Sequence, residues 1–235
     1  MDTYEMCAGL VIAQGGGRVL DYGCGAGQIV GILRARGIDA SGCDVFYGGG
    51  DYSTHIPAEL AADIRRMQDG RIPFPDDTFD VVISNQVMEH VPDLTAVSRE
   101  IARVLRPGGR AIHVFPDRGV WREGHCGIPF LHWFPKGSAL RVYYAATLRK
   151  LGLGSYTTGK TAMQWSRDFC EWLDAWTHYR SQREVHAAIG GRIEHLEHLW
   201  FDARLGKRPL PPPLKRWVTR KLAGMVLVSY CINED

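Results

Sequence analysis

The chain has 235 residues, a length that suits one α/β domain with a lobe inserted into it. Hydrophobic residues make up 45% of the chain and charged residues 23%, which are the values of a globular protein and exclude intrinsic disorder. The formal net charge of +2 is too close to neutral to indicate a nucleic-acid partner. We therefore expect a single globular domain over residues 1–235 that acts on something other than nucleic acid.

The cysteines and the first residues predict where the protein works. The 6 cysteines are scattered and form no C-x-x-C pair, which is typical of reduced thiols. The N-terminal region lacks the basic segment of a signal peptide, and no apolar run reaches the roughly 20 residues that span a membrane. We expect a cytoplasmic protein with no integral membrane segment. The sequence carries no signal for its oligomeric state.

Short apolar runs alternate with amphipathic segments over residues 1–115, which is the pattern of βαβ units. The segment 59–68 is ambiguous, and we predict a helix there that runs into a short third strand. The other expected strands are 18–22, 38–44, 79–85 and 110–115, and the expected helices are 28–36 and 94–105.

The segment 116–183 has a different composition, because all 7 tryptophans of the chain follow the fifth strand. We predict a helical, aromatic-rich lobe inserted there. Its aromatic residues either form a small core of their own or shape an acceptor pocket over the cofactor domain, and the two interpretations are compatible. The rest of the chain can complete the sheet, with a helix, a strand near 193–196, a proline-rich linker at 207–213, a basic helix and a final strand at 225–231.

The first predicted strand ends in a glycine loop. A strand that ends in Gly-x-Gly-x-Gly and opens a helix brings bare backbone close to a ligand, and here the glycines are Gly23, Gly25 and Gly27. The dinucleotide pattern G-x-G-x-x-G is not matched, because residue 28 is Gln28. Asp21 directly before the loop would repel a pyrophosphate but attract an amino group or a sulfonium. The loop therefore disfavours NAD.

Two further carboxylates follow predicted strands. Asp44 ends the second strand, where a carboxylate can accept hydrogen bonds from both hydroxyls of a ribose; alternatively, it caps a turn. Asp69 and Gly70 come after the third strand, where a carboxylate can accept from an exocyclic amine such as that of adenine. Together with the glycine loop, these residues predict a nucleoside-binding edge.

As an ordered set, these motifs closely resemble the class I S-adenosylmethionine (SAM) dependent methyltransferases of the small-molecule type, which includes the ubiquinone and menaquinone methylases. The resemblance covers about residues 15–116 and is carried by 19–27, Asp44, Asp69-Gly70, 73–82, 89–93 and 105–109. It implies a Rossmann-like, doubly wound α/β fold with a seven-stranded, mostly parallel sheet whose last strand is antiparallel. It also implies SAM as the cofactor.

The resemblance also implies roles for individual residues. Asp21 and Gly23 would lie near the methionine moiety, Asp44 on the ribose and Asp69 at the adenine amine, with Asn85 and Gln86 lining the methyl end. Quinone O-methyltransferases in this group carry a glutamate at the position of Gln86 and use it with the following Glu-His pair around a divalent metal. Because the loss of one carboxylate ligand weakens such a site, we expect no metal here.

Methyl transfer to a hydroxyl needs a base, and three histidines are candidates. His125 and His132 lie in the predicted lobe, in a loop broken by glycine and proline after the fifth strand. His90 follows the fourth strand at the edge where open α/β folds bind ligands. The alternatives are buried, hydrogen-bonded imidazoles for the lobe histidines and a helix-start role for His90.

We expect a methyl transfer from SAM to a small-molecule acceptor, or to one linked to a lipid or glycan, with oxygen as the acceptor atom. Two alternatives stay open: another transfer chemistry on the same fold, such as aminopropyl transfer, and a non-catalytic SAM-binding partner subunit. The segment 214–222 places basic residues around apolar ones. It predicts a solvated helix with one core face, or alternatively a peripheral membrane contact.

Overall fold

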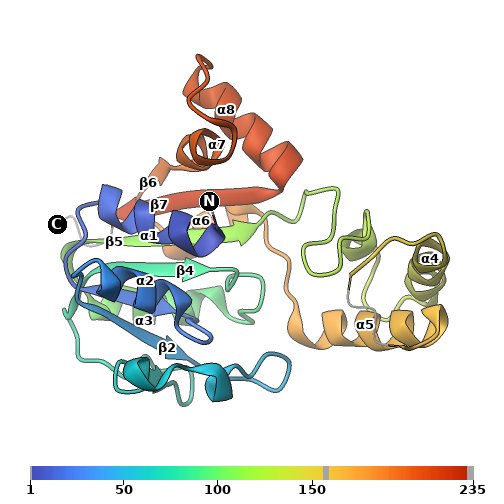
Figure 1. Ribbon diagram of the computed structural model, residues 1–235, viewed down its shortest axis with the longest axis horizontal. Coiled ribbons are helices and arrows are strands. Elements are labelled where there is room, and N and C mark those ends of the chain that lie inside the picture. The colour runs from blue at the N-terminus through green and yellow to red at the C-terminus, as the bar shows by residue number, and fades with distance from the viewer. Residues whose placement is uncertain (1, 156–158, 232–235) are drawn as a thin grey trace.

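The computed structural model describes residues 2–155 and 159–231 and shows a seven-stranded sheet in the order β3-β2-β1-β4-β5-β7-β6 (Figure 1). Strands β1 to β5 are parallel, whereas β7 runs antiparallel to both β5 and β6. The predicted fold class is therefore confirmed. The strands are β1 (Val19–Tyr22), β2 (Ala40–Asp44), β3 (Ile64–Arg66), β4 (Phe79–Asn85), β5 (Leu105–Pro116), β6 (Arg192–His195) and β7 (Met225–Cys231).

Helices cover both faces of this sheet. The helices are α1 (Thr3–Ala13), α2 (Gln28–Ala35), α3 (Leu94–Val104), α4 (Ala139–Lys150), α5 (Ala162–Trp176), α6 (Gln182–Ile189), α7 (Glu197–Leu205) and α8 (Pro212–Val218). One core joins α1, α2 and α7 to one face, and a second core joins α3 and α6 to the other. Burial on both faces explains why all four residues of β1 are buried and why the middle of β4, residues 81–83, is a continuous apolar run.

Three elements differ from the sequence prediction. Helix α1 was not predicted, because its residues are apolar almost all round and show no polar face. The predicted helix within 59–68 is wrong: a 3-10 turn, Ala58–Leu60, follows Pro57, and the chain is already extended at Ile64 to pair with Gly42. Strand β5 starts at Leu105, before the Pro-Gly-Gly cluster, because Leu105 pairs with Phe79 ahead of a register shift.

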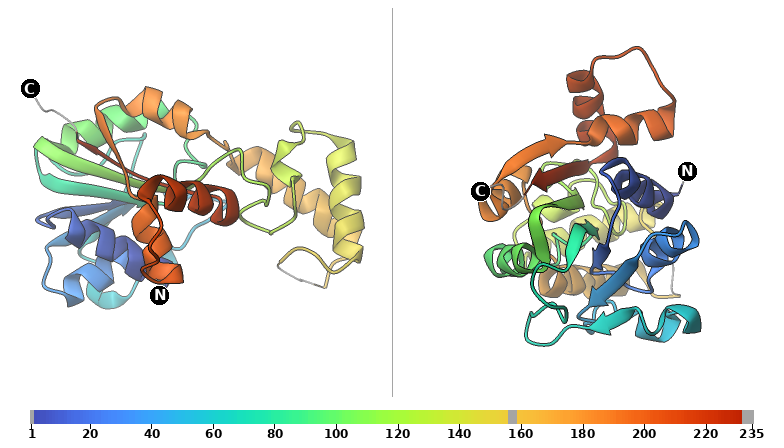
Figure 2. Two further views of the ribbon diagram at one scale, coloured as in Figure 1. Left: turned by 90° about the horizontal axis from the view of Figure 1, so that it is seen from above. Right: turned by 90° about the vertical axis from the view of Figure 1, so that its left-hand side faces the viewer.

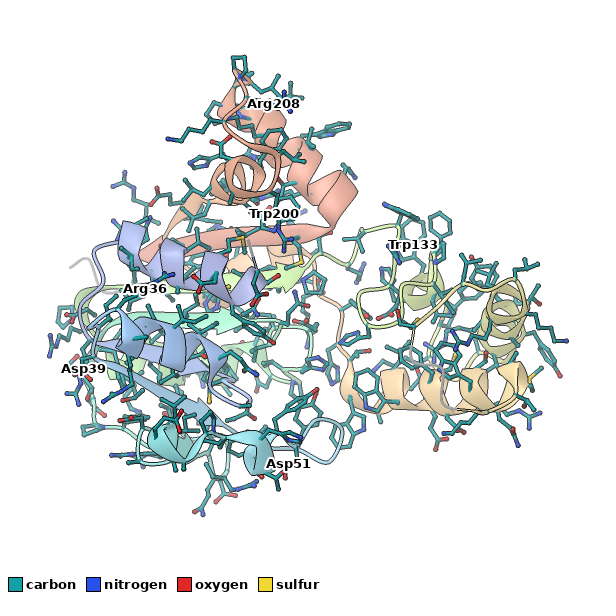
Figure 3. The ribbon with its side chains drawn as sticks, in the orientation of Figure 1. Arg36, Asp39, Asp51, Trp133, Trp200 and Arg208 are labelled. Carbon is teal, nitrogen blue, oxygen red and sulfur yellow. The ribbon has the colours of Figure 1, made fainter. Side chains whose placement is uncertain are left out.

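The segment between β5 and α6 forms a lobe that stands off the sheet. Figures 1 and 2 show α4 and α5 packed side by side, on the side toward which β4 and β5 point. Figure 3 shows the same polarity, with Trp133 on the lobe and Asp39, just before β2, at the far edge of the sheet. The lobe has a separate core that includes Ile128, Trp165 and Leu173. The carboxyl edge of the sheet therefore faces the lobe.

Two properties of the described residues bear on the earlier expectations. No helix among them is both long and apolar enough to cross a membrane. Five cysteines are free and buried, namely Cys7, Cys24, Cys43, Cys126 and Cys170.

Candidate active site

The glycine loop connects β1 to α2 at the carboxyl edge of the sheet. Gly23, Gly25 and Gly27 all adopt positive φ angles, of 74°, 53° and 81°. A Cβ on Gly23 would lie 2.4 Å from Val87 Cγ2, so this glycine lets the segment after β4 pack against the loop. A Cβ on Gly25 would meet only Tyr52, at 3.7 Å. The backbone at Gly25 is thus the part of the loop open to a ligand.

Asp44 holds this loop at the end of β2. Its Oδ2 accepts a hydrogen bond from the Gly25 N–H at 2.9 Å, and its Oδ1 accepts one from the Phe46 N–H at 2.8 Å. The residue is 9% exposed, so the carboxylate is fixed by backbone groups. Each carboxylate oxygen can accept more than one hydrogen bond, which leaves capacity on both for the two hydroxyls of a ribose.

Asp21 is the second carboxylate beside the loop and is 2% exposed. Burial, and next the nearby Asp44, raise the pKa of Asp21 to about 8. A cationic group bound next to it would favour the ionised form. This arrangement suits a ligand with an ammonium or sulfonium group and not a phosphate.

The other predicted cofactor residues are held less firmly. Asp69 and Gly70 are exposed, and they form the two central residues of a tight turn closed by the Arg71 N–H and the Gln68 carbonyl at 2.9 Å. Gln86 is exposed with a φ of 58°, and its amide lies 3.4 Å from Met225 Sδ. Asn85 has a buried Oδ1 without a hydrogen-bond partner among the described residues. The predicted roles of these residues stay predictions.

A second group of polar residues lies where the lobe meets the end of β4. His125 Nδ1 is 2.8 Å from Glu123 Oε1, and His125 Nε2 is 3.3 Å from His90 Nε2. His90 Nδ1 in turn lies 2.7 Å from the Trp176 carbonyl oxygen at the end of α5. Tyr179 donates to the same Glu123 oxygen. The fold thus brings together two of the three predicted histidines, and we call His90, His125, Glu123 and Glu89 the histidine cluster.

Glu123 organises this cluster. It is 1% exposed and accepts from the backbone N–H groups of His125 and Cys126 at 2.9 and 2.6 Å, besides the two side chains. Burial alone would raise its pKa, but the hydrogen bond and charge of His125 and these further donors lower the pKa of Glu123 to about 2. Burial alone would lower the pKa of His125, but its hydrogen bond and ion pair with Glu123 raise that pKa overall. The pKa of His90 is lowered, mainly by burial. Glu123 is therefore an ionised anchor for His125.

Glu89 is the remaining carboxylate of the cluster. It is fully buried, and neither of its carboxylate oxygens has a hydrogen-bond partner among the described residues. Burial raises the pKa of Glu89 to about 7. One ligand atom each from Glu89, His90 and His125 lie within 4.8 Å of one another. A buried carboxylate without partners is costly unless something binds it.

His132 lies beside the cluster but outside it. Its ring stacks at a tilt on Tyr179, with centroids 4.6 Å apart, and its Nε2 faces the Arg118 carbonyl oxygen at 3.2 Å. Sequence reasoning did not single out Glu123, Tyr179 or Glu89 as site residues. Two signals were available: the Glu-His pair that the resemblance implies, at Glu89, and the position of Glu123 two residues before His125. Tyr179 gave none, because it is 54 residues further along the chain than His125.

The glycine loop, Asp21 and Asp44, which we call the cofactor edge, lie next to the histidine cluster. The Tyr47 ring, three residues after Asp44, lies 5.8 Å from the His90 ring and 5.0 Å from that of Trp176. Trp172 Nε1 donates to the Gly49 carbonyl at 3.2 Å, which ties α5 to the same loop. Hence the lobe is docked directly on the segment that follows β2.

Two surface cavities lie near these regions, one beside the glycine loop and one at the base of the lobe. One of about 640 Å³ opens beside Gly27 and is lined by Tyr4 and Leu60 among others. Another, of about 590 Å³, lies at the base of the lobe and is lined by Asp117, Arg118, Gly119, His132, Trp133 and Ser181. Neither cavity is lined by Asp21, Asp44 or a residue of the histidine cluster, so the site described above lies between them and not in either one.

Comparison with known proteins identifies the chain. A family model described as "Methyltransferase domain" matches residues 20–113. The chain is 32% identical over 219 residues to 27-O-demethylrifamycin SV methyltransferase of Amycolatopsis mediterranei, covering 86% of this chain and 75% of that protein. It is 34% identical over 107 residues to 2-phytyl-1,4-naphtoquinone methyltransferase of Synechococcus elongatus, covering 42% and 46%.

A further relative is the ubiquinone biosynthesis O-methyltransferase of Rhizobium leguminosarum, 31% identical over 127 residues, with 52% of this chain and 50% of that protein covered. Apart from the rifamycin enzyme, the chain spans about half the length of these curated relatives. Among solved structures, the fold is similar to a SAM-dependent methyltransferase from Mesorhizobium loti, with a TM-score of 0.52, 20% identity and coverage of 92% and 91%. The glycine loop, the seven-stranded sheet and these similarities together show that the chain belongs to the class I SAM-dependent methyltransferases.

Proposed function

We propose that this chain transfers the methyl group of SAM to a hydroxyl oxygen of a small, largely apolar molecule. The observation that carries the proposal is the position of the histidine cluster: His90 and His125 lie next to the loop after Asp44, at the same sheet edge as the glycine loop. A base and a SAM-binding edge within one site are what methylation of a hydroxyl requires.

The residues at the sheet edge fit SAM. Asp44 would hold the ribose hydroxyls, Asp21 would attract the ammonium and sulfonium charges, and the open backbone at Gly25 would lie along the ligand. Bound there, SAM supplies a methyl group that is already strongly electrophilic. The protein has to fix the acceptor oxygen in line with that methyl group and exclude water.

His125 is the residue that would accept the acceptor's proton. Glu123 accepts a hydrogen bond from Nδ1 of His125. The lone pair on Nε2 of the neutral ring is then free to accept a proton, on the side that faces His90. The hydroxyl proton passes to Nε2, the oxygen forms a bond to the methyl carbon, and the carbon–sulfur bond breaks with its electron pair on sulfur. Glu123 stabilises the imidazolium that results, in the way a carboxylate does in a catalytic triad.

The acceptor class follows from the lobe and the relatives. Aromatic rings of Trp172, Tyr179 and Tyr47 lie against the two histidines, which favours an apolar, aromatic acceptor. The names of three relatives point to rifamycin SV, ubiquinone and naphthoquinone compounds as their acceptors or products. We therefore infer a phenol, catechol or hydroquinone as the substrate class.

The test is a transfer assay with methyl-labelled SAM and a panel of catechols, hydroquinones and naphthohydroquinones, run beside calorimetry with SAM and S-adenosylhomocysteine. We expect micromolar-range binding and labelled ether products. If SAM binds tightly but no acceptor with a hydroxyl is labelled, while thiols, amines or carbon nucleophiles are, the acceptor atom is not oxygen. If SAM does not bind, the proposal fails at its first step.

A further inference from the structure

The hydrogen bonds of the cluster determine where the imidazole protons are. His90 Nδ1 lies 2.7 Å from the backbone carbonyl oxygen of Trp176. A carbonyl oxygen can only accept a hydrogen bond, so Nδ1 must carry the proton. In the neutral ring, Nε2 of His90 is then an acceptor with a free lone pair.

The same reasoning holds for His125. Its Nδ1 lies 2.8 Å from a carboxylate oxygen of Glu123. Because Glu123 also accepts from the Tyr179 hydroxyl and from two backbone N–H groups, it acts as an acceptor toward His125, and Nδ1 carries the proton. Nε2 of His125 therefore also has a lone pair in the neutral ring. The two Nε2 atoms face each other at 3.3 Å, so two acceptors meet without a donor between them.

The Glu89 carboxylate adds a third set of lone pairs. It is fully buried, it has no hydrogen-bond partner among the described residues, and one of its oxygens lies within 4.8 Å of a ring nitrogen of each histidine. One proton shared by the two imidazoles would satisfy the nitrogens but would leave Glu89 buried and unpartnered. A cation would satisfy all three groups at once.

We propose that Glu89, His90 and His125 bind a divalent cation of the zinc class. With zinc–nitrogen distances of about 2.0–2.1 Å, two nitrogens 3.3 Å apart subtend an angle of about 107° at the metal, which is close to tetrahedral. The Glu89 oxygen would move toward the cation as the third ligand. Two imidazoles and one carboxylate favour zinc and similar transition metals over magnesium, which prefers oxygen ligands.

The outer contacts support a metal as well. Histidine ligands usually donate their second N–H to a carboxylate or a backbone carbonyl, which fixes the tautomer and the ring plane. Glu123 does this for His125, and the Trp176 carbonyl does it for His90. The structure therefore already contains the hydrogen-bond acceptors that would orient His125 and His90 as metal ligands.

This proposal replaces the sequence expectation that no metal binds. That expectation depended on Gln86, which lies at the exposed edge beside Met225 and takes no part in the cluster. In place of residue 86, the third ligand is His125, which comes from the lobe. It lies more than 30 residues further along the chain and is not part of the motif around Glu89-His90.

The proposal deepens the proposed function and depends on it for its chemical role. Three protein ligands leave a fourth position open for the acceptor hydroxyl, and a bound divalent cation lowers the pKa of that hydroxyl. With the cation bound, Nε2 of His125 would be a ligand and the hydroxyl proton would leave to solvent; in the chain without the cation, Nε2 is the base described above. The oxygen then forms the bond to the methyl carbon as the carbon–sulfur bond breaks.

The experiment is a Co²⁺ titration of the full chain after treatment with a chelator, followed by competition with Zn²⁺. We expect one equivalent of Co²⁺ to give the intense visible bands of a four-coordinate site, and Zn²⁺ to abolish them. His90→Ala, His125→Ala and Glu89→Gln should each weaken Co²⁺ binding at least about tenfold. His198→Ala, on α7 and outside the cluster, is the control and should bind like the wild type.

Calorimetry with SAM shows whether each variant is folded, because the cofactor edge does not include these three side chains. A chain that binds SAM but takes up no stoichiometric Co²⁺ or Zn²⁺ would overturn the proposal, as would binding that survives all three substitutions. Metal binding without SAM binding would instead contradict the proposed function and leave the metal site standing. The two failures are therefore distinguishable.

Discussion

The cofactor edge and the lobe position their polar residues in different ways. At the cofactor edge, Asp44 is held by backbone N–H groups of Gly25 and Phe46, both supplied by loops that follow neighbouring parallel strands. In the lobe, Glu123 also accepts from two backbone N–H groups, but it accepts in addition from two side chains that it orients, those of His125 and Tyr179. The first arrangement follows from the sheet. The second requires the lobe to fold and dock as a unit.

The buried carboxylates of the two regions differ accordingly. Burial, and next the nearby Asp44, raise the pKa of Asp21, whereas the pKa of Glu123 is lowered despite its burial because four hydrogen-bond donors face it. A positively charged ligand bound beside Asp21 would favour the ionised form of its carboxyl group. The lobe already contains the partners of its carboxylate.

The largest expected effect concerns Glu123. All the partners of the Glu123 carboxylate are hydrogen-bond donors. In Glu123→Gln, the amide N–H would face one of these donors, so His125 would lose its orientation. We expect kcat/KM to fall by about 10²–10⁴-fold, with the SAM affinity unchanged. Steady-state kinetics with the best acceptor from the labelled-SAM assay measures this. The exposed Glu171 on α5 is the control, and Glu171→Gln should behave like the wild type. Unchanged kinetics in Glu123→Gln would show that the side-chain network of the lobe has no catalytic part.

The separate cores give the next test. Leu173 is 1% exposed in the lobe core and Leu20 is fully buried in the sheet core. Each change to alanine should lower the free energy of unfolding of its own region by about 2–5 kcal/mol. For Leu173→Ala, we expect hydrogen exchange to rise in α4 and α5 only, with SAM binding retained. For Leu20→Ala, we expect the whole chain to unfold earlier. If both variants show the same single transition, the lobe and the sheet fold as one unit.

A smaller effect concerns pH. Because the pKa of Asp21 is about 8 in the folded chain and near 3.8 when unfolded, the folded state holds its proton more tightly. The stability from Asp21 is therefore present below pH 4 and is lost as the pH rises through 8. Asp21→Asn should flatten that slope in melting temperatures measured without ligand. Wild-type SAM binding near pH 7 should release up to one proton, visible in calorimetry in buffers of different ionisation enthalpy. A slope that is identical in Asp21→Asn would mean that this carboxyl is not the titrating group.

Sequence patterns predicted the strands and the glycine loop of the sheet edge well, since strand–glycine–helix order is a local feature. The bounds of β4 and β7 match the prediction, and Asp44 lies at the end of β2 as expected. Helix α1 was missed because a helix that is apolar on all sides has no periodic pattern to detect. The short 58–66 region was misread because the pairing of Ile64 with Gly42 overrides local helix propensity.

The lobe was predictable in position but not in its contacts. The aromatic composition indicated a helical insertion after the fifth strand, and α4 and α5 are there. The pairing of His90 with His125, and of Glu123 with Tyr179, joins residues 35 and 56 positions apart. No spacing rule connects them, because loop lengths and docking angles decide which side chains meet. His132 was chosen by the same argument as His125, and the fold separates the two.

The central claim is that the cofactor edge binds SAM and that the lobe supplies the catalytic groups. The most direct test measures both SAM affinity and kcat/KM for Asp44→Ala and for His125→Ala. We predict that Asp44→Ala weakens SAM binding at least about tenfold, on the order of 1.4 kcal/mol, because it removes a charged acceptor and the partner of the Gly25 N–H. We predict that His125→Ala leaves SAM affinity within about twofold and lowers kcat/KM by about 100-fold or more. If His125→Ala weakens SAM binding as much as Asp44→Ala does, the lobe belongs to the cofactor site, and cofactor binding and catalysis are not divided between the two regions.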